Sequence, residues 1–158
     1  MSEEEKLSSY LSKSKLISNS NYEKKIRIAI LGGFTLNGLE ETMRVKCDEK
    51  KIQCTTFVSG YNQYNQEILD EKSQLYKFSP DITFLIIDSR NALGEFFLNP
   101  YSISAEERKR FVEDKSNEII NLAKELVKKS KSKLVISNFS VLSYSPIGIN
   151  ETKEEFGL

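Results

Sequence analysis

The stretch Ile26-Arg27-Ile28-Ala29-Ile30-Leu31-Gly32-Gly33 decides the fold of this chain. Its aliphatic and β-branched residues run on to a pair of glycines, which is typical of a buried strand that ends in a tight turn. Three further runs rich in such residues follow, at 52–58, 82–87 and 134–137, and Gly, Pro, Asp or Asn bound them. We therefore predict four strands, of which the first and third are buried on both faces.

A helix is predicted between the first two strands. Asn37 offers an N-cap, and Glu40 follows it at the spacing of a capping box. Apolar residues then recur on one face of the helix at Leu39, Met43 and Cys47. A helix in this place is a crossover between neighbouring strands.

A longer helix is predicted between the third and fourth strands. It begins at a capping box formed by Ser104 and Glu107. The residues of its apolar face are Ile119, Leu122, Ala123, Leu126 and Val127. Repeated strand, helix, strand units imply parallel pairing through right-handed crossovers. The expected fold is an open, mostly parallel α/β sheet with helices on both faces, a three-layer α/β/α arrangement.

An extra helix, residues 4–17, is predicted before the first strand, and a Ser- and Asn-rich segment, residues 18–21, joins it to the sheet. Residues 1–21 are therefore assigned to an N-terminal helix and joint. Residues 22–158 are assigned to one α/β domain, a length that suits a single core.

The composition argues against several classes of partner. Lys plus Arg and Asp plus Glu both total 23, so the net charge is zero and no global field attracts nucleic acid or an anionic membrane. No apolar run reaches the roughly 18 to 20 residues that span a bilayer, and the start is acidic, unlike a signal peptide. We expect a cytoplasmic protein with no nucleic-acid partner and no membrane partner.

Residues that suit catalysis or metal binding are scarce. The chain has no histidine, so any catalytic interpretation must work without an imidazole near neutral pH. Cys47 and Cys54 are too few and too isolated for a zinc site or a disulfide scaffold. We interpret both as small buried hydrophobic residues and expect no metal site.

Three loops of the predicted sheet carry the distinctive polar residues. Open α/β sheets bind ligands outside the carboxyl ends of their strands, where the loops after strands one, two and three would meet. The candidate binding residues are Gly32, Gly33, Phe34, Thr35, Asn37, Gly60, Tyr61, Asn62, Gln63, Tyr64, Asp88, Arg90 and Asn91. The glycines allow close backbone approach, and backbone amides after Asn37 would point toward an anion. An oxyanion or carboxylate pocket is one interpretation.

Residues 60–70 form the most distinctive of these loops. Two tyrosines and four side-chain amides lie there between two strands, and an ordinary connection has no physical need for so many polar groups. We interpret the loop as a recognition element. In the structural alternative, Tyr61 and Tyr64 pack as lids, and the amides of Asn62, Gln63, Asn65 and Gln66 bind the loop's own backbone.

Structural alternatives exist for the other groups as well. Asn37 is favoured as a helix cap only. For Thr35 the alternative is a bond to the following turn, and for Asp88 with Arg90 it is a local ion pair, with the binding role left open. A basic cluster near the end of the long helix consists of Lys124, Lys128, Lys129, Lys131 and Lys133. These cations offset the helix dipole, and the alternative is a surface for an acidic carrier protein.

Several blocks resemble the amino-terminal domain of FkbH-like proteins, which belong to subfamily IIIC of the HAD superfamily. The blocks are Gly32-Gly33-Phe34-Thr35, residues 60–70, residues 75–81, Tyr144-Ser145-Pro146-Ile147-Gly148 and Glu154-Glu155-Phe156-Gly157. The resemblance runs from about residue 26 to the end of the chain. It implies an SGNH-hydrolase-like domain, with a flavodoxin-like sheet, that precedes a HAD domain.

The resemblance also implies a function for the whole architecture. The HAD domain, with magnesium and an Asp-x-Asp motif, loads a glyceryl unit onto an acyl carrier protein in polyketide-type biosynthesis. This chain has no Asp-x-Asp followed by Thr or Val, so the phosphotransfer chemistry and its magnesium are expected to belong to a HAD domain in cis or in trans. SGNH-like folds usually add a fifth strand, so we expect the domain to be incomplete at its C-terminus, with an unpaired fourth-strand edge.

The catalytic residues of SGNH hydrolases are matched by position only. Thr35, Gly60 and Asn91 occupy comparable places, but the Gly-Asp-Ser turn is missing, and a late histidine would lie beyond residue 158. A hydroxyl without an adjacent base is a weak nucleophile. We therefore expect a non-catalytic recognition domain for the carrier protein or its substrate. The alternatives are a degenerate esterase or acyltransferase, with Thr35 as nucleophile and Asn91 and the glycine amides as oxyanion donors, and a structural or dimerisation domain.

Overall fold

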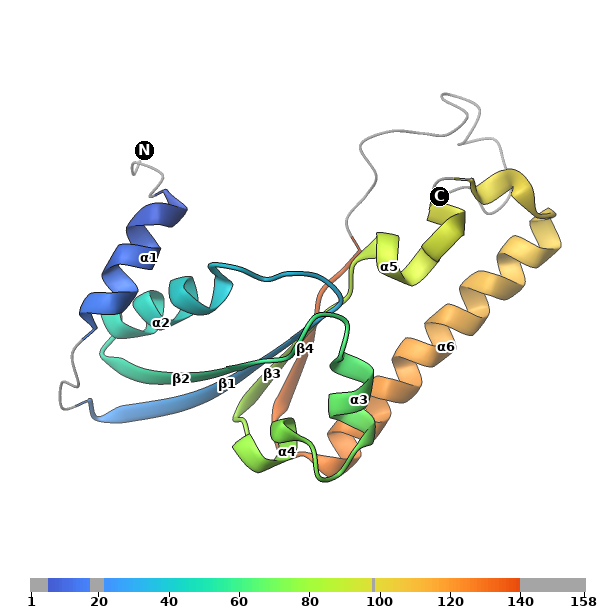
Figure 1. Cartoon of the computed structure of the whole chain (residues 1–158). Coiled ribbons are helices and arrows are strands. Elements are labelled where there is room, and N and C mark those ends of the chain that lie inside the picture. Colours follow the sequence, from blue (N-terminus) through green and yellow to red (C-terminus); the bar gives the residue numbers. More distant parts are fainter. Residues whose placement is uncertain (1–5, 18–21, 98, 140–158) are drawn as a thin grey trace.

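The computed structural model describes residues 6–17, 22–97 and 99–139. Four parallel strands form one open sheet in the order β2-β1-β3-β4 (Figure 1). The strands are β1 (Lys24–Gly32), β2 (Ile52–Val58), β3 (Ile82–Ile86) and β4 (Lys133–Ile136). All four predicted strands are confirmed, with small shifts at their ends.

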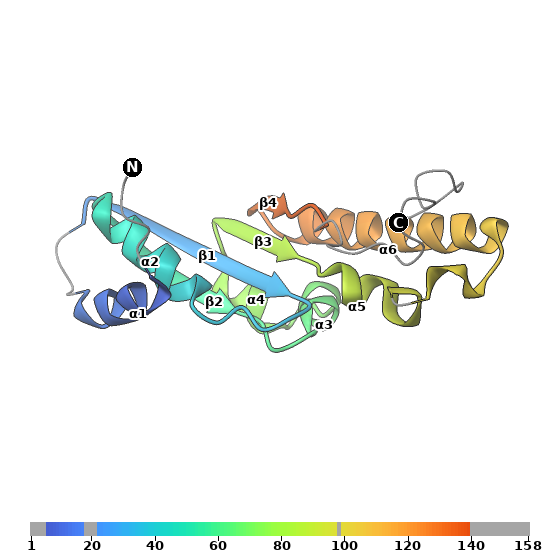
Figure 2. The same cartoon turned by 90° about the horizontal axis from the view of Figure 1, so that it is seen from above.

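Helices cover both faces of the sheet (Figures 1 and 2). One face carries α1 (Leu7–Leu16) and α2 (Leu39–Glu49); the other carries α3 (Tyr64–Leu69), α4 (Gln74–Phe78) and α6 (Ala105–Lys129). Between β3 and α6 lie α5 (Ser89–Leu93) and two 3-10 turns, Gly94–Phe97 and Pro100–Ser102. The predicted open, parallel, three-layer α/β/α fold with an extra N-terminal helix is confirmed. The connections turn in opposite directions from β1 and from β3, so the topological switch point lies between these two strands.

The main core lies between the sheet and the helices α3, α4 and α6. Ala29, Leu31 and Leu85 of the sheet are fully buried there. Their helical partners are Tyr64, Ile68, Leu75, Leu122 and Leu126. The prediction of burial on both faces holds only for the second half of β1. It is wrong for β3, where buried and half-buried residues alternate, because α2 packs over β2 and does not cover β3.

The start of α2 differs from the prediction. Its N-cap is Gly38, whose φ of 85° is left-handed, and no side chain caps the helix. Asn37 lies one residue too early to cap, so the predicted cap is wrong. Glu40, the expected capping-box partner, instead accepts a hydrogen bond from the hydroxyl of Thr56 at 2.6 Å. The most buried residue of α2 is Val45, whereas the predicted apolar face at Leu39, Met43 and Cys47 is half-buried.

The capping box of α6 is confirmed. The hydroxyl of Ser104 accepts a hydrogen bond from the main-chain N–H of Glu107 at 3.3 Å, and the Glu107 carboxylate accepts one from the N–H of Ser104 at 2.9 Å. Leu122 and Leu126 of the predicted apolar face are buried. Val127 is 60% exposed, because one residue turns the helix by about 100° and carries this side chain off the buried face.

The N-terminal helix α1 packs against α2. Segment 18–21 and the blocks at 144–148 and 154–157 lie outside the described residues.

Cys47 and Cys54 are free and half-buried, less enclosed than predicted. Burial and the neighbouring Cys47 raise the pKa of the Cys54 thiol to about 12. Within the described residues, β4 is an edge strand, in line with the unpaired edge that we expected.

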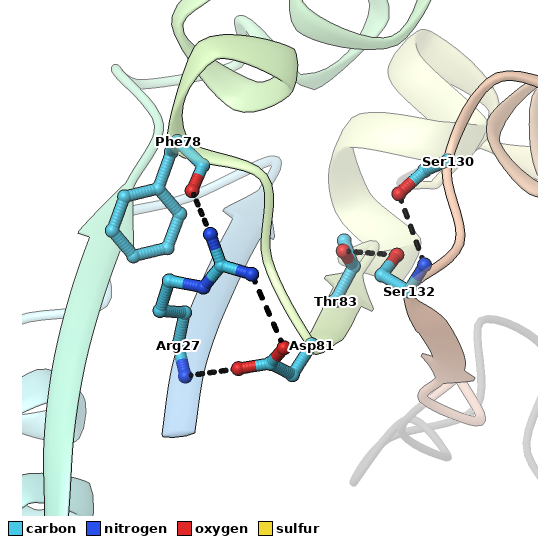
Figure 3. A network of polar contacts seen from close by, with 6 residues as sticks. All are labelled: Arg27, Phe78, Asp81, Thr83, Ser130 and Ser132. Atoms are coloured by element: carbon cyan, nitrogen blue, oxygen red, sulfur yellow. Dashed lines mark hydrogen bonds and ion pairs between the residues drawn. The ribbon is translucent and has the colours of Figure 1, made fainter. Parts of the chain in front are cut away.

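A polar network ties the amino ends of three strands together (Figure 3). The carboxylate of Asp81 accepts a hydrogen bond from the main-chain N–H of Arg27 at 2.7 Å and another from its guanidinium at 3.3 Å. These two bonds lower the pKa of Asp81. The hydroxyls of Thr83 and Ser132 form a buried hydrogen bond of 2.9 Å between β3 and the start of β4. The loops of the candidate site lie at the opposite end of the sheet, beyond the carboxyl ends of the strands.

Candidate functional site

The three predicted loops meet at the carboxyl ends of the strands, because β1, β2 and β3 are parallel neighbours. Seven of the thirteen candidate residues form two groups there. The first, which we call the switch-point cluster, is Gly33, Tyr64 and Asn91. The second lines a cavity beside the ends of β1 and β2, which we call the rim cavity.

The switch-point cluster joins loops from three strands. The side-chain amide of Asn91 donates a hydrogen bond to the main-chain carbonyl of Gly33. A Cβ atom on Gly33 would lie 3.3 Å from the Asn91 side-chain nitrogen and 3.7 Å from a ring carbon of Tyr64. Asp88 caps α5 by accepting a hydrogen bond from the main-chain N–H of Asn91 at 3.3 Å. The cap fixes the backbone from which Asn91 reaches Gly33.

Tyr64 is a core residue, only 8% exposed. The expected loop over residues 60–70 is wrong from this position onward, since α3 begins at Tyr64. Tyr64 and Ile68 are one helical turn apart and both point into the core, which holds this short helix in place. Burial, and next the charge of Glu118, raise the pKa of Tyr64. Its phenol is therefore neutral near pH 7, a hydrogen-bonding group and not a base.

The turn before α3 brings the Gln63 side chain over Gly60. The main-chain N–H of Gln63 donates to the carbonyl of Gly60 at 3.1 Å. A Cβ atom on Gly60 would lie only 2.4 Å from the side-chain oxygen of Gln63, so this side chain folds over the glycine. Asn62 is exposed in a left-handed conformation, with a φ of 53°, and Tyr61 is 66% exposed. Tyr61 is thus not a packed lid.

The rim cavity has a volume of about 480 Å³. Four predicted residues line it: Phe34, Thr35, Asn37 and Tyr61. Leu7 and Leu11 of α1 form a further wall. Sequence reasoning missed these two leucines, although their spacing of four residues marks one face of the N-terminal helix.

The structure does not support the oxyanion interpretation of the glycine loop. The N–H of Gly32 points to the hydroxyl of Ser59 at 3.4 Å, and the N–H of Gly33 donates to the carbonyl of Ile86 at 3.1 Å. Both proposed donors are therefore in use. The first turn of α2 carries Glu40 and Glu41, which place negative charge where an anion was expected.

Thr35 and Asn91 lie in different surroundings. Thr35 is exposed and lines the rim cavity, whereas Asn91 belongs to the switch-point cluster and does not line that cavity. A nucleophile at Thr35 and an oxyanion donor at Asn91 would thus face different spaces. Asp88 and Arg90 also do not pair as a local ion pair in the described structure. Asp88 caps α5, and the Arg90 guanidinium lies over the ring of Phe97, 5.1 Å from its centre.

Metal and membrane features are absent from the described part of the chain. No group of three or more Cys, Asp or Glu side chains in residues 6–17, 22–97 and 99–139 is arranged to hold a metal ion. Across the same ranges, no helix combines the length and apolar character needed to cross a bilayer.

The fold and the position of the site define a class. This is a doubly wound, flavodoxin-like α/β domain whose distinctive residues lie at the topological switch point and beside it. Residues 27–154 match the family model of the FkbH N-terminal domain. The chain therefore belongs to the FkbH N-terminal domain family, and the resemblance seen in the sequence is confirmed.

A solved structure shares the fold. It is the N-terminal part of the protein BF1531 from Bacteroides fragilis, described as containing a phosphatase domain complexed with Mg. The TM-score is 0.74 at 17% identity, over 93% of this chain and 37% of that one. The present chain thus spans little more than a third of that protein fragment. A search of the curated proteins gives no match.

Proposed function

We propose that this chain is the recognition domain of an FkbH-like protein and that its rim receives an acyl carrier protein loaded with a glyceryl unit. Membership of the FkbH N-terminal domain family supports this proposal. The observation that carries it is the rim cavity beside the ends of β1 and β2, next to the hydrogen bond from Asn91 to Gly33 that joins the loops after β1 and β3. Doubly wound sheets place their ligands at this point.

The proposal assigns the transfer chemistry to a HAD domain, in cis or in trans. The similar Bacteroides fragilis structure is described with a phosphatase domain and Mg, which supports such an arrangement. The described residues of this chain do not fit a magnesium centre, so no metal-dependent step is assigned to them. Their part is to bind and orient a partner.

The basic cluster lies at the opposite end of the strands from the proposed recognition surface. The end of α6 leads into the amino end of β4, whereas the rim lies at the carboxyl ends of the strands. Lys129 also has an internal role, because its ammonium donates to the carbonyl of Leu69 at 3.0 Å and pairs with Glu125 at 3.4 Å. We therefore attribute Lys129 to local contacts and the cluster as a whole to the helix dipole.

Nuclear magnetic resonance titration tests the proposal. The labelled chain is titrated with holo and with glyceryl-loaded acyl carrier protein, and the amides of residues 60–66 and 88–91 are followed. Localised shifts in these two segments are expected. Shifts confined to residues 124–133 would place the carrier on the basic cluster instead, and no shifts in a folded sample would overturn the recognition role. A serine-directed phosphonate should leave Thr35 unlabelled.

A further inference from the structure

The rim cavity is closed on one side by a helix that lies outside the family match. α1 ends at Leu16, whereas the match begins at residue 27. Leu7 lies against Gly38: a Cβ atom on this glycine would be 2.5 Å from a Leu7 methyl carbon. The ring of Tyr10 holds α1 to α2, because the Lys46 ammonium lies 5.1 Å from its centre. α1 thus forms an anchored wall of the rim cavity.

The cavity surface is rich in exposed apolar groups. Leu7 and Leu11 are 51% and 38% exposed, and Phe34 and Tyr61, which also line the cavity, are 38% and 66% exposed. Val58 also contributes to the lining. Such a gathering of large apolar side chains is typical of a surface that meets a ligand. A volume of about 480 Å³ lies within the range of small-molecule sites, roughly 300 to 1,000 Å³.

The polar groups of the cavity are neutral or acidic. Thr35, Asn37 and Ser59 supply hydroxyl and amide groups that can donate and accept hydrogen bonds. Glu40 and Glu41 are the charged lining residues, and no Lys or Arg of the described chain lines the cavity. The two carboxylates lie in the first turn of α2, where the helix dipole offsets their charge. A ligand anion would be repelled by these two carboxylates with no lining cation to offset the repulsion, whereas an uncharged ligand would not be repelled.

We propose that the rim cavity binds the uncharged part of an acyl thioester arm, with its amide at the polar side chains and its acyl chain against α1. This inference rests on the proposed function, which brings an acyl thioester to the rim. Leu7 and Leu11 limit the length of the acyl chain, and Glu40 and Glu41 select against acyl groups that end in a carboxylate.

Two probes of similar size test the proposal on the full chain. They are S-butyryl-N-acetylcysteamine, which is neutral, and S-succinyl-N-acetylcysteamine, which ends in a carboxylate. The neutral thioester is expected to shift the amides of Thr35, Ser59 and Tyr61 saturably, and the succinyl thioester to bind at least about tenfold more weakly. Leu11→Glu is expected to weaken binding of the neutral probe about tenfold. Leu16→Glu is the matched control on the same helix, because Leu16 is 80% exposed and does not line the cavity.

Three results would overturn the inference: no saturable shifts with the butyryl thioester, equal affinity for the two thioesters, or equal effects of the two leucine variants. The outcome is separable from that of the proposed function. Carrier-induced shifts at residues 88–91 without thioester binding would overturn the cavity assignment alone. Thioester binding without any carrier-induced shift would overturn the carrier role alone.

Discussion

The side-chain amide of Asn91 donates a hydrogen bond to the main-chain carbonyl of Gly33, across the switch point between β1 and β3. The two residues are 58 positions apart in sequence. Gly33 leaves room for this side chain, because a Cβ atom there would lie 3.3 Å from the Asn91 nitrogen, a tight contact. The loop after β3 is thereby fixed to the loop after β1, at the centre of the proposed recognition surface.

Removal of this bond should loosen the rim and cost stability. Asn91→Ala leaves the Gly33 carbonyl without its partner, and a lost hydrogen bond of this kind costs about 1 kcal/mol of unfolding free energy. Urea denaturation measures the loss, and hydrogen exchange at residues 88–93 should accelerate. Asn117→Ala is the matched control, because Asn117 is exposed on α6 and its replacement should change stability by less than about 0.5 kcal/mol. Equal behaviour of the two variants would show that the bond does not hold the rim.

Gly38 should control the attachment of α1. Gly38→Ala places a side chain at a φ of 85° and drives its Cβ into Leu7, so we expect a loss of about 1 to 2 kcal/mol and release of α1. Proteolysis within residues 7–16 reports the release. Gly94→Ala is the control: it also has a positive φ, 57°, but its Cβ would meet nothing within 4 Å. It should lose stability while α1 stays protected, and proteolysis of α1 in both variants would refute the packing argument.

The sequence predicts those features of the fold that depend on neighbouring residues. The strands follow from runs of β-branched residues, and the capping box of α6 follows from the spacing of Ser104 and Glu107. The position of the rim follows from parallel topology. By contrast, the N-cap of α2 is Gly38 and not the predicted Asn37, because the left-handed turn needs a residue without a Cβ atom.

Features that arise from long-range packing could not be read from local patterns. α3 is too short to be stable alone, and it forms because Tyr64 and Ile68 are buried against β1, β3 and α6. The wall of the rim cavity arises because α1 folds back over α2 and brings Leu7 onto Gly38. No spacing within the candidate loops indicates that this distant helix completes the cavity.

The hydrogen bonds that the Asp81 carboxylate accepts from the main chain and side chain of Arg27 predict a pH dependence with a definite sign. The pKa of Asp81 is lowered on folding, so its contribution to stability is present above the unfolded carboxyl pKa of about 4 and is lost as the pH falls through the folded value. Both side chains are about half exposed, at 47% and 48%, so solvent screening limits the contribution to about 0.5 kcal/mol.

Two variants separate the causes of this lowered pKa. Asp81→Asn should reduce stability near pH 7 and flatten the stability curve below pH ~4. Arg27→Gln removes the guanidinium but keeps the main-chain N–H, which is the largest cause of the shift, so most of the acid dependence should persist. Urea denaturation between pH ~2.5 and ~7 measures both. Loss of the whole acid dependence in Arg27→Gln would assign the effect to the side chain.

The buried hydroxyls of Thr83 and Ser132, at the amino ends of β3 and β4, should contribute to stability cooperatively. Thr83 is fully buried, and its hydroxyl lies 2.9 Å from that of Ser132, which is 9% exposed (Figure 3). Thr83→Val preserves the shape but leaves the Ser132 hydroxyl without this partner, at a cost of about 1 to 3 kcal/mol. In the double variant Thr83→Val, Ser132→Ala, both polar groups are gone, so the loss of unfolding free energy should be smaller than the sum of the two single losses. Thr55→Val on the exposed side of β2 is the control and should be nearly neutral. Strictly additive losses in urea denaturation would mean that the two hydroxyls act independently and that the link from β3 to β4 depends on backbone pairing alone.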